Sequence, residues 1–190
     1  MRSRAAVLVA LIVGLPLRPA TGEVIDRIVA VVDNRPVFLS EVRAVQLVRG
    51  TDESVAREAL IDEILMYAEA RRYLPARPTR DEQERARASL EQPPPAEVHA
   101  EDALLTAIAR REATILKYVQ LRFAPLIHVE DTDVIRAYDA RWANDPLAPP
   151  LTQVRADLIA EITRGRLDAR IESWVAQLRA VASIRYNEGP

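Results

Sequence analysis

The carboxy-terminal part of the chain carries one helical apolar period that extends from Leu151 to Val181. Apolar residues recur there every three or four positions, namely Leu151, Val154, Leu158, Ile162, Ile171, Trp174, Leu178 and Val181. At 1.5 Å per residue such a helix would be about 45 Å long, well beyond the usual helix length. Gly165 weakens it by about 1 kcal/mol and is the place where we expect a bend. A helix of this length traverses the whole molecule, so it predicts a mainly helical fold in which other elements cover its apolar face.

The amino-terminal side of the chain predicts a β-hairpin. Residues 24–32 are rich in β-branched side chains, residues 33–34 (Asp-Asn) favour a turn, and residues 37–39 resume the apolar run. Pro36 has no amide proton, so we expect the second strand to be short or to lie at the edge of a sheet. Residues 184–186 also have strand character, and we expect them to return and pair with this hairpin.

Several shorter helices are predicted between these two features. Ser40 is expected to cap a helix that ends near Val48, with Gly50 as a left-handed stop. Thr51 or Asp52 then opens the next helix. The buried face of that helix recurs every three or four residues, at Ala56, Leu60, Ile64 and Tyr67.

The middle of the chain predicts three further helical segments. Thr79 and Glu82 have the spacing of a capping box, which starts one helix. Residues 101–123 predict one long helix or two helices joined near Arg111. Residues 131–142 predict another helix, with apolar and aromatic residues on one side.

Residues 1–22 have the three parts of a secretory signal peptide. A charged start is followed by the uncharged run 5–17, which is shorter than the roughly 20 residues that a transmembrane helix needs. The small residues Ala20 and Gly22 stand at the minus-three and minus-one positions for cleavage after Gly22. The sequence therefore predicts an exported mature protein that begins at Glu23; the alternative is a short buried helix of a cytosolic protein.

The chain offers little material for catalysis. It contains no cysteine and only two histidines, His99 and His128, and neither has the spacing of a metal site or a catalytic motif. The acidic residues at 130, 131 and 133 favour the start of a helix through its dipole, which explains them without a bound cation. A formal net charge of -2 provides no basic face for nucleic acid. We therefore expect no enzyme activity, no catalytic residue, no metal and no cofactor.

Four segments of the mature chain carry recognisable motifs. They are V-I-D-R-I-V-A-V-V-D-N with P-V-F-L-S-E-V (residues 24–42), L-I-D-E-I-L (60–65), the stretch from L-R-F (121–123) to residues 131–138, and V-R-A-D-L-I with W-V-A-Q-L-R (154–159 and 174–179). In sequence and in order these segments resemble the SurA-type periplasmic chaperone family, and the first segment is the most specific. Family members with isomerase activity have parvulin domains at the point where this chain has only residues 143–150. The glycine-rich G-D-L-G segment of those domains is also missing.

The resemblance implies a SurA/trigger-factor-like peptide-binding module of several helices, with a small amino-terminal β-hairpin joined by a short carboxy-terminal strand. We expect one chaperone-like domain over residues 23–190. It comprises an amino-terminal part (23–142), a proline-rich linker (143–150), and a closing helix with its tail (151–190).

The function that the resemblance implies is that of an ATP-independent periplasmic holdase without isomerase activity. Its partners would be unfolded or extended polypeptides, chiefly outer-membrane proteins, with no nucleic acid and no stable membrane insertion after signal cleavage. Two alternatives use the same module. One is a dedicated periplasmic interaction subunit whose cleft serves a single partner protein, and the other is an isomerase whose active site is supplied by another chain.

Large side chains are the candidates for the lining of a peptide-binding cleft, and they are Tyr67, Tyr73, Phe123, Trp142 and Trp174. Ordinary core packing at helical spacing is the alternative for each of them.

Overall fold

The structure is a computed structural model that describes residues 26–90, 102–143 and 145–187. Within these residues the helices are α1 (Leu39–Arg49), α2 (Glu53–Ala70), α3 (Arg80–Leu90), α4 (Asp102–Arg122), α5 (Asp131–Trp142) and α6 (Leu151–Val181), with short 3₁₀ helices η1 (Leu74–Ala76) and η2 (Ala124–Leu126). The strands are β1 (Ile28–Val32), β2 (Arg35–Phe38) and β3 (Ile184–Tyr186), which form one antiparallel sheet. The mainly helical fold class with a small sheet is therefore confirmed.

Some predictions fall outside the described residues. These are the signal peptide at 1–22 with its cleavage after Gly22, and the histidine at 99. None of the described helices combines the length and the apolar character needed to cross a membrane.

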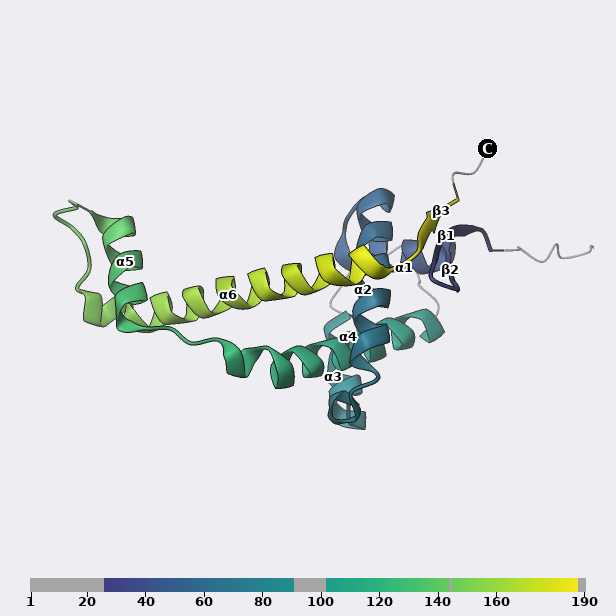
Figure 1. The fold of residues 1–190 in the computed structure, drawn as a ribbon, viewed down its shortest axis with the longest axis horizontal. Helices are drawn as coiled ribbons and strands as arrows, with labels where there is room; N and C mark the ends of the chain where they lie inside the picture. Colours follow the sequence, from purple (N-terminus) through teal and green to yellow (C-terminus); the bar gives the residue numbers. More distant parts are fainter. Residues whose placement is uncertain (1–25, 91–101, 144, 188–190) are drawn as a thin grey trace, which may run out of the picture.

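The sheet joins residues that are far apart in the sequence. Its strand order is β2-β1-β3, and Val31 of β1 lies opposite Pro36 of β2 on one side and opposite Arg185 of β3 on the other. In Figure 1, β3 follows α6 and lies beside β1. β2 is short and lies at the edge of the sheet, where proline is tolerated, as predicted. The predicted return of the carboxy-terminal strand to the hairpin is also confirmed.

Three local signals for helix ends behave as the sequence predicts. Gly50 follows α1 with φ 62°, a left-handed conformation that glycine adopts without strain. Asp52 is the N-cap of α2, and its carboxylate accepts a hydrogen bond from the backbone N–H of Val55 at 2.9 Å. Thr79 and Glu82 form the reciprocal capping box before α3, with N···O distances of 2.6 and 3.2 Å.

Ser40 does not cap α1, and that prediction is wrong. The helix begins at Leu39, and the N-cap position belongs to Phe38. The carboxylate of Glu41 accepts a hydrogen bond from the backbone N–H of Phe38 at 3.2 Å, which satisfies that free amide from inside the helix. The hydroxyl of Ser40 donates instead to Asp26, which also accepts the Ser40 N–H at 3.2 Å. Ser40 therefore links the segment before β1 to the start of α1 through hydrogen bonds.

Two buried clusters hold the helices together. The first joins β1, β2, α1 and α2 to Ile108 of α4. The second, which we call the aromatic cluster, joins the end of α2 and η1 to α4 and α6. Its buried members are Ala70, Ala76, Tyr118, Val119, Phe123 and Trp174. Leu178 of α6 packs against both clusters, so the closing helix connects them.

The closing helix is continuous through Gly165 and runs from the sheet and the other helices to α5 at the opposite end of the molecule, as Figure 1 shows. Its carboxy-terminal half packs on α2, where Arg179 donates hydrogen bonds to the carboxylates of Asp62 and Glu58. The residues between 102 and 122 also form one helix. The alternative of two helices joined near Arg111 is thus excluded.

α5 packs on the amino-terminal half of α6 at the far end of the molecule. Val134 of α5 and Leu158 of α6 are each only 1% exposed, so this small contact has its own buried centre. Arg141 donates two hydrogen bonds to Glu161 across it, at 2.6 and 2.7 Å. We call this part, α5 with the amino-terminal half of α6, the distal arm.

Candidate functional site

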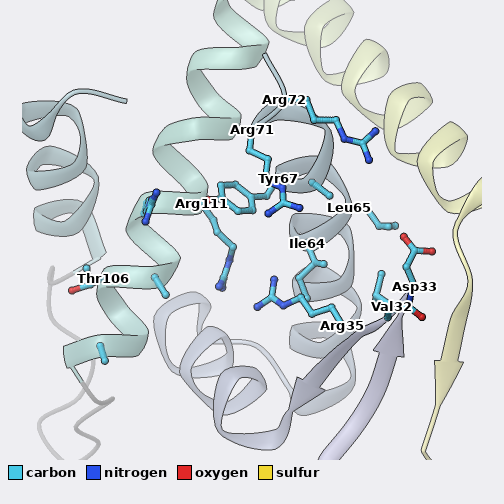
Figure 2. Close-up of a pocket in the computed structure, with 15 residues that line it drawn as sticks. Val32, Asp33, Arg35, Ile64, Leu65, Tyr67, Arg71, Arg72, Thr106 and Arg111 are labelled. Atoms are coloured by element: carbon cyan, nitrogen blue, oxygen red, sulfur yellow. The ribbon is translucent and has the colours of Figure 1, made fainter. Parts of the chain in front are cut away.

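A cavity of about 760 Å³ lies between the tip of the hairpin, α2 and α4. Figure 2 shows side chains from these three elements around it, including Val32 at the hairpin, Ile64 and Tyr67 on α2, and Arg111 on α4. A further cavity of about 640 Å³ continues toward η1 and α3. The two cavities share the lining residues Tyr67, Arg71, Arg72 and Arg110. We refer to them together as the α2–α4 groove.

Helical spacing explains why these side chains line one groove. On α2, Ile64, Ala68 and Arg71 follow one another at intervals of three or four residues, so they share one face of the helix. Ala103 and Ala107 do the same on α4 and are small. Because an alanine fills little of the space between two helices, this arrangement leaves room that larger side chains would occupy.

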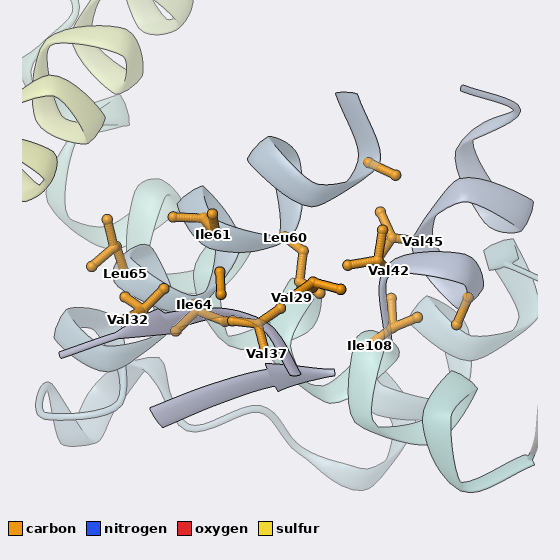
Figure 3. Packing of buried hydrophobic residues seen from close by; sticks show 13 residues of the cluster. Val29, Val32, Val37, Val42, Val45, Leu60, Ile61, Ile64, Leu65 and Ile108 are labelled. Atoms are coloured by element: carbon orange, nitrogen blue, oxygen red, sulfur yellow. The ribbon is translucent and has the colours of Figure 1, made fainter. Parts of the chain in front are cut away.

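The floor of the groove is part of the first buried cluster. Val32, Ile64 and Leu65 line the cavity in Figure 2 and also appear in the core packing of Figure 3. Each of the three is at most 5% exposed. These three residues therefore close the groove from below, and the partly exposed side chains of Tyr67, Ala68 and Ala107 provide the apolar surface that an entering side chain meets.

A buried ion-pair network lies beside this floor. Arg111 of α4 is only 6% exposed, and its Nε donates to a carboxylate oxygen of Glu63 on α2 at 2.5 Å. Glu63 is 2% exposed and also accepts a hydrogen bond from Arg49 of α1 at 3.1 Å. Arg35 of the hairpin donates to Glu41 at 2.8 Å. The charges of Arg35 and Arg111 are therefore compensated inside the protein.

Glu112, next to this network on α4, has a raised pKa. Partial burial disfavours its charged form first, and the negative charge of Glu63 adds to the effect. Arg49 and Arg111 oppose the shift but do not cancel it.

The remaining arginines of the groove have a different environment. Arg71, Arg77 and Arg110 are exposed and form no ion pair with any described residue. Arg72, which follows α2, forms its one ion pair with a described residue to Glu69 of that helix, at 3.6 Å. The groove thus combines an apolar floor with a rim of arginines whose charges are largely uncompensated within the described chain.

The five aromatic residues predicted from the sequence lie in three separate places. Tyr67 lines the groove. Tyr73, Phe123 and Trp174 come together in the aromatic cluster, around Tyr118, whose ring centroid lies 5.9, 5.8 and 5.1 Å from theirs. Phe123 and Trp174 are each only 9% exposed, which leaves little of their surface for a ligand.

Trp142, the fifth of these residues, lies at the far end of the molecule. It is half-buried in the distal arm, with its ring 5.1 Å from that of Tyr138. The guanidinium of Arg141 lies over the Trp142 ring at 5.4 Å from its centroid. Trp142 therefore belongs neither to the groove nor to the aromatic cluster.

The arginines of the rim were not among the residues predicted from the sequence. Their signal was the position of Arg71 seven residues after Ile64 on one helical face, matched by Arg110 seven residues after Ala103 on another. That signal becomes informative only when the two helices are known to lie side by side.

The described residues contain no cluster of histidine, cysteine, aspartate or glutamate that could hold a metal ion. Comparisons of the chain with protein-family models, with curated proteins and with solved structures find no match.

Proposed function

We propose that this protein is an ATP-independent chaperone that holds apolar segments of unfolded polypeptides, and that it does so without prolyl isomerase activity. The observation that carries the proposal is the α2–α4 groove. A volume of about 760 Å³ lies within the range of roughly 300 to 1,000 Å³ that is usual for ligand pockets. It can accept several side chains of an extended segment.

The lining of the groove suits reversible holding. The apolar floor belongs to the buried core, so a client side chain that packs on it leaves water. Burial of apolar area contributes a free energy of about 25 cal/mol per Å². The polar rim keeps the empty groove compatible with water. No chemical step and no energy source is needed for binding of this kind.

The distal arm offers additional apolar surface. Exposed residues there and along the path to it are Leu121, Leu126, Ile135 and Leu147, with Leu147 88% exposed. A client too large for the groove can contact these residues as well. Several weak contacts on one protein raise the overall affinity without any single tight site.

The order of the elements supports the same proposal. The amino-terminal hairpin, the closing helix and the returning strand together make one module, which is the arrangement that the SurA-type resemblance implies. Only residues 143–150 separate α5 from α6, too few for an inserted isomerase domain. In this proposal the protein works in the periplasm, and its clients are outer-membrane proteins in transit.

The test is an aggregation assay on the mature protein. Several unrelated unfolded proteins, one of them an outer-membrane barrel, are diluted from urea and their light scattering is followed with and without ATP. We expect aggregation to be suppressed equally in both conditions, while the slow proline phase of a refolding client keeps its uncatalysed rate. Failure to protect any client would overturn the holding function and favour a subunit dedicated to one partner; acceleration of the proline phase would refute the absence of isomerase activity.

A further inference from the structure

We propose that the α2–α4 groove selects client segments that carry acidic side chains between apolar ones, and that Arg71, Arg77 and Arg110 bind their carboxylates. The inference rests on the proposed holding function and names the chemical class of segment that the groove prefers. It is carried by the charges of the groove and by the position of those charges above an apolar floor.

The groove has an excess of positive charge. Among the described residues that line the two cavities, Asp33 is the one acidic residue. The carboxylate of Asp33 accepts a hydrogen bond from the backbone N–H of Ser183 at 2.9 Å and forms no ion pair with a described residue. Arg35 and Arg111 are compensated by Glu41 and Glu63, as described above. The arginines at 71, 77 and 110 have no such partner among the described residues, so their guanidinium groups are available to a ligand.

The rim arginines come from both sides of the groove. Arg71 lies at the carboxy-terminal end of α2, where it lines both cavities, and Arg110 lines both cavities from α4. Arg77 follows η1 and lines the second cavity. A guanidinium group matches a carboxylate with two parallel hydrogen bonds, which a point charge such as an ammonium cannot do. An extended segment lying along the groove therefore meets arginines in succession.

The floor under these arginines favours apolar side chains between the acidic residues of the ligand. Ile64, Leu65, Ala68 and Ala107 provide apolar or small side chains there. In an extended peptide, successive side chains point to opposite faces. A segment that alternates acidic and apolar residues can direct its apolar side chains to the floor and its carboxylates to the rim.

The same observations argue against a nucleic acid as the ligand. The whole chain has a formal net charge of -2, so the positive charge is local and does not form an extended basic face. Single-stranded nucleic acid also needs several aromatic rings on which bases stack. Of the described residues that line the two cavities, Tyr67 is the one with an aromatic ring.

The test is fluorescence anisotropy with two labelled peptides of about 10 residues, which in extended form are about 33 Å long at about 3.3 Å per residue. In one peptide Asp and Glu alternate with Leu and Tyr, and in the other Asn and Gln replace the acids. The groove variant Arg71→Gln/Arg110→Gln is compared with Arg43→Gln/Arg164→Gln. These control arginines are exposed, form no ion pair with a described residue and lie outside the groove. Both variants lose the same charge, and thermal melts establish that both are folded.

We expect the wild-type protein to bind the acidic peptide at least about tenfold more tightly than the neutral one. The groove variant should lose most of this preference, and the control variant should change by less than about twofold. Salt at about 500 mM should weaken the binding of the acidic peptide far more than that of the neutral one.

Equal binding of the two peptides by the wild-type protein would overturn the inference, as would equal losses in the two variants or displacement of the acidic peptide by a thymidine oligonucleotide. These outcomes are separable from the holding function. Acid preference without aggregation suppression would remove the holding function and leave the ligand class of the groove intact. Suppression of aggregation without a preference for the acidic peptide would refute the inferred ligand class and leave the holding function intact.

Discussion

At the residue scale, the buried pair between Arg111 and Glu63 is the contact most sensitive to substitution. Both side chains are almost fully buried, and Nε of Arg111 lies 2.5 Å from the Glu63 carboxylate. A buried charge without its partner keeps its desolvation cost and loses its compensation. Loss of one residue of the pair is therefore expected to lower the free energy of unfolding by more than the intact pair contributes to it.

We predict that Glu63→Ala lowers the free energy of unfolding by about 3 to 5 kcal/mol, because Arg111 then stays buried with only the more distant carboxylate of Glu41, at 3.9 Å, to compensate its charge. The double variant Glu63→Leu/Arg111→Met should recover most of that loss, since both buried charges of the pair are gone and the remaining charges of Arg49 and Glu41 keep Glu112 and Arg35 as partners. Urea denaturation measures both. Glu84→Ala is the control, because its partner Arg80 is 90% exposed and exposed pairs contribute at most about 1 kcal/mol. A double variant less stable than Glu63→Ala would contradict this account.

The raised pKa of Glu112 predicts how the stability of the fold depends on pH. Its ordinary pKa is 4.5, and burial with the nearby charge of Glu63 raises the pKa in the folded state. Between these two pKa values the folded protein binds more protons than the unfolded chain, so stability falls as the pH rises through this window. Glu112→Gln removes the charge and should therefore be more stable than the wild type at about pH 7, with a smaller difference at about pH 4. Denaturation midpoints that diverge toward acid pH would disprove this assignment.

Residues that act locally could be predicted from the sequence, and residues that act through the tertiary fold could not. Gly50 and Asp52 depend on the conformation of their own turn, and both predictions are confirmed. Tyr67 was singled out as a large side chain, and the structure places it in the groove. The rim arginines gave no comparable signal, because Arg accounts for all but one of the 26 basic residues of the chain and Arg71 does not stand out among them.

At the element scale, the continuity of α6 explains how the two ends of the molecule are connected. The sequence predicted its length because the apolar period is local. The sequence could not indicate that one half of α6 packs on α2 and the other half on α5, since that depends on the elements that meet it. Gly165 lies in the middle of this helix, and an added Cβ there would meet no atom within 4 Å.

Gly165→Ala should raise the free energy of unfolding by roughly 0.5 to 1 kcal/mol, because alanine loses less backbone freedom than glycine on entering a helix. Gly50→Ala should lower it by a similar amount. Gly50 also has open space around it but adopts φ 62°, a conformation that alanine does not favour. Thermal denaturation of the two variants makes a matched comparison. A loss of stability in Gly165→Ala would show that the flexibility of α6 is needed in the folded state.

At the scale of the whole molecule, the chain forms a body, made of the sheet, α1 to α4 and the carboxy-terminal half of α6, and the distal arm. α6 and residues 123–130 connect the two parts. α6 contributes Trp174 to the aromatic cluster, Leu178 to both buried clusters and, through β3, the third strand of the sheet. The sequence predicted that the closing helix would meet the first half of the chain, and these contacts confirm it. The elongated shape in Figure 1 was not predictable, because it follows from where α5 meets α6.

Deletion of residues 151–190 should abolish the cooperative thermal unfolding of the remaining chain. Each large apolar side chain that loses its burial costs about 1.5 to 3 kcal/mol, and a whole domain is stable by only about 5 to 15 kcal/mol. The deletion also removes Arg179, which donates to Asp62 and Glu58. Circular dichroism of the truncated protein checks this. An unchanged cooperative transition would show that residues 26–143 fold independently.

The central claim is that the protein holds unfolded polypeptide in the α2–α4 groove, and filling the groove tests it most directly. Ala107 lines the cavity, whereas Ala160 is exposed on α6 outside it. Ala107→Leu and Ala160→Leu are the same change in two places. Light scattering of an outer-membrane barrel protein diluted from urea is recorded with each variant and with the wild type, after circular dichroism has verified their fold. We predict that several-fold more Ala107→Leu than wild type is needed for the same protection, while Ala160→Leu matches the wild type. Full protection by folded Ala107→Leu would contradict the claim.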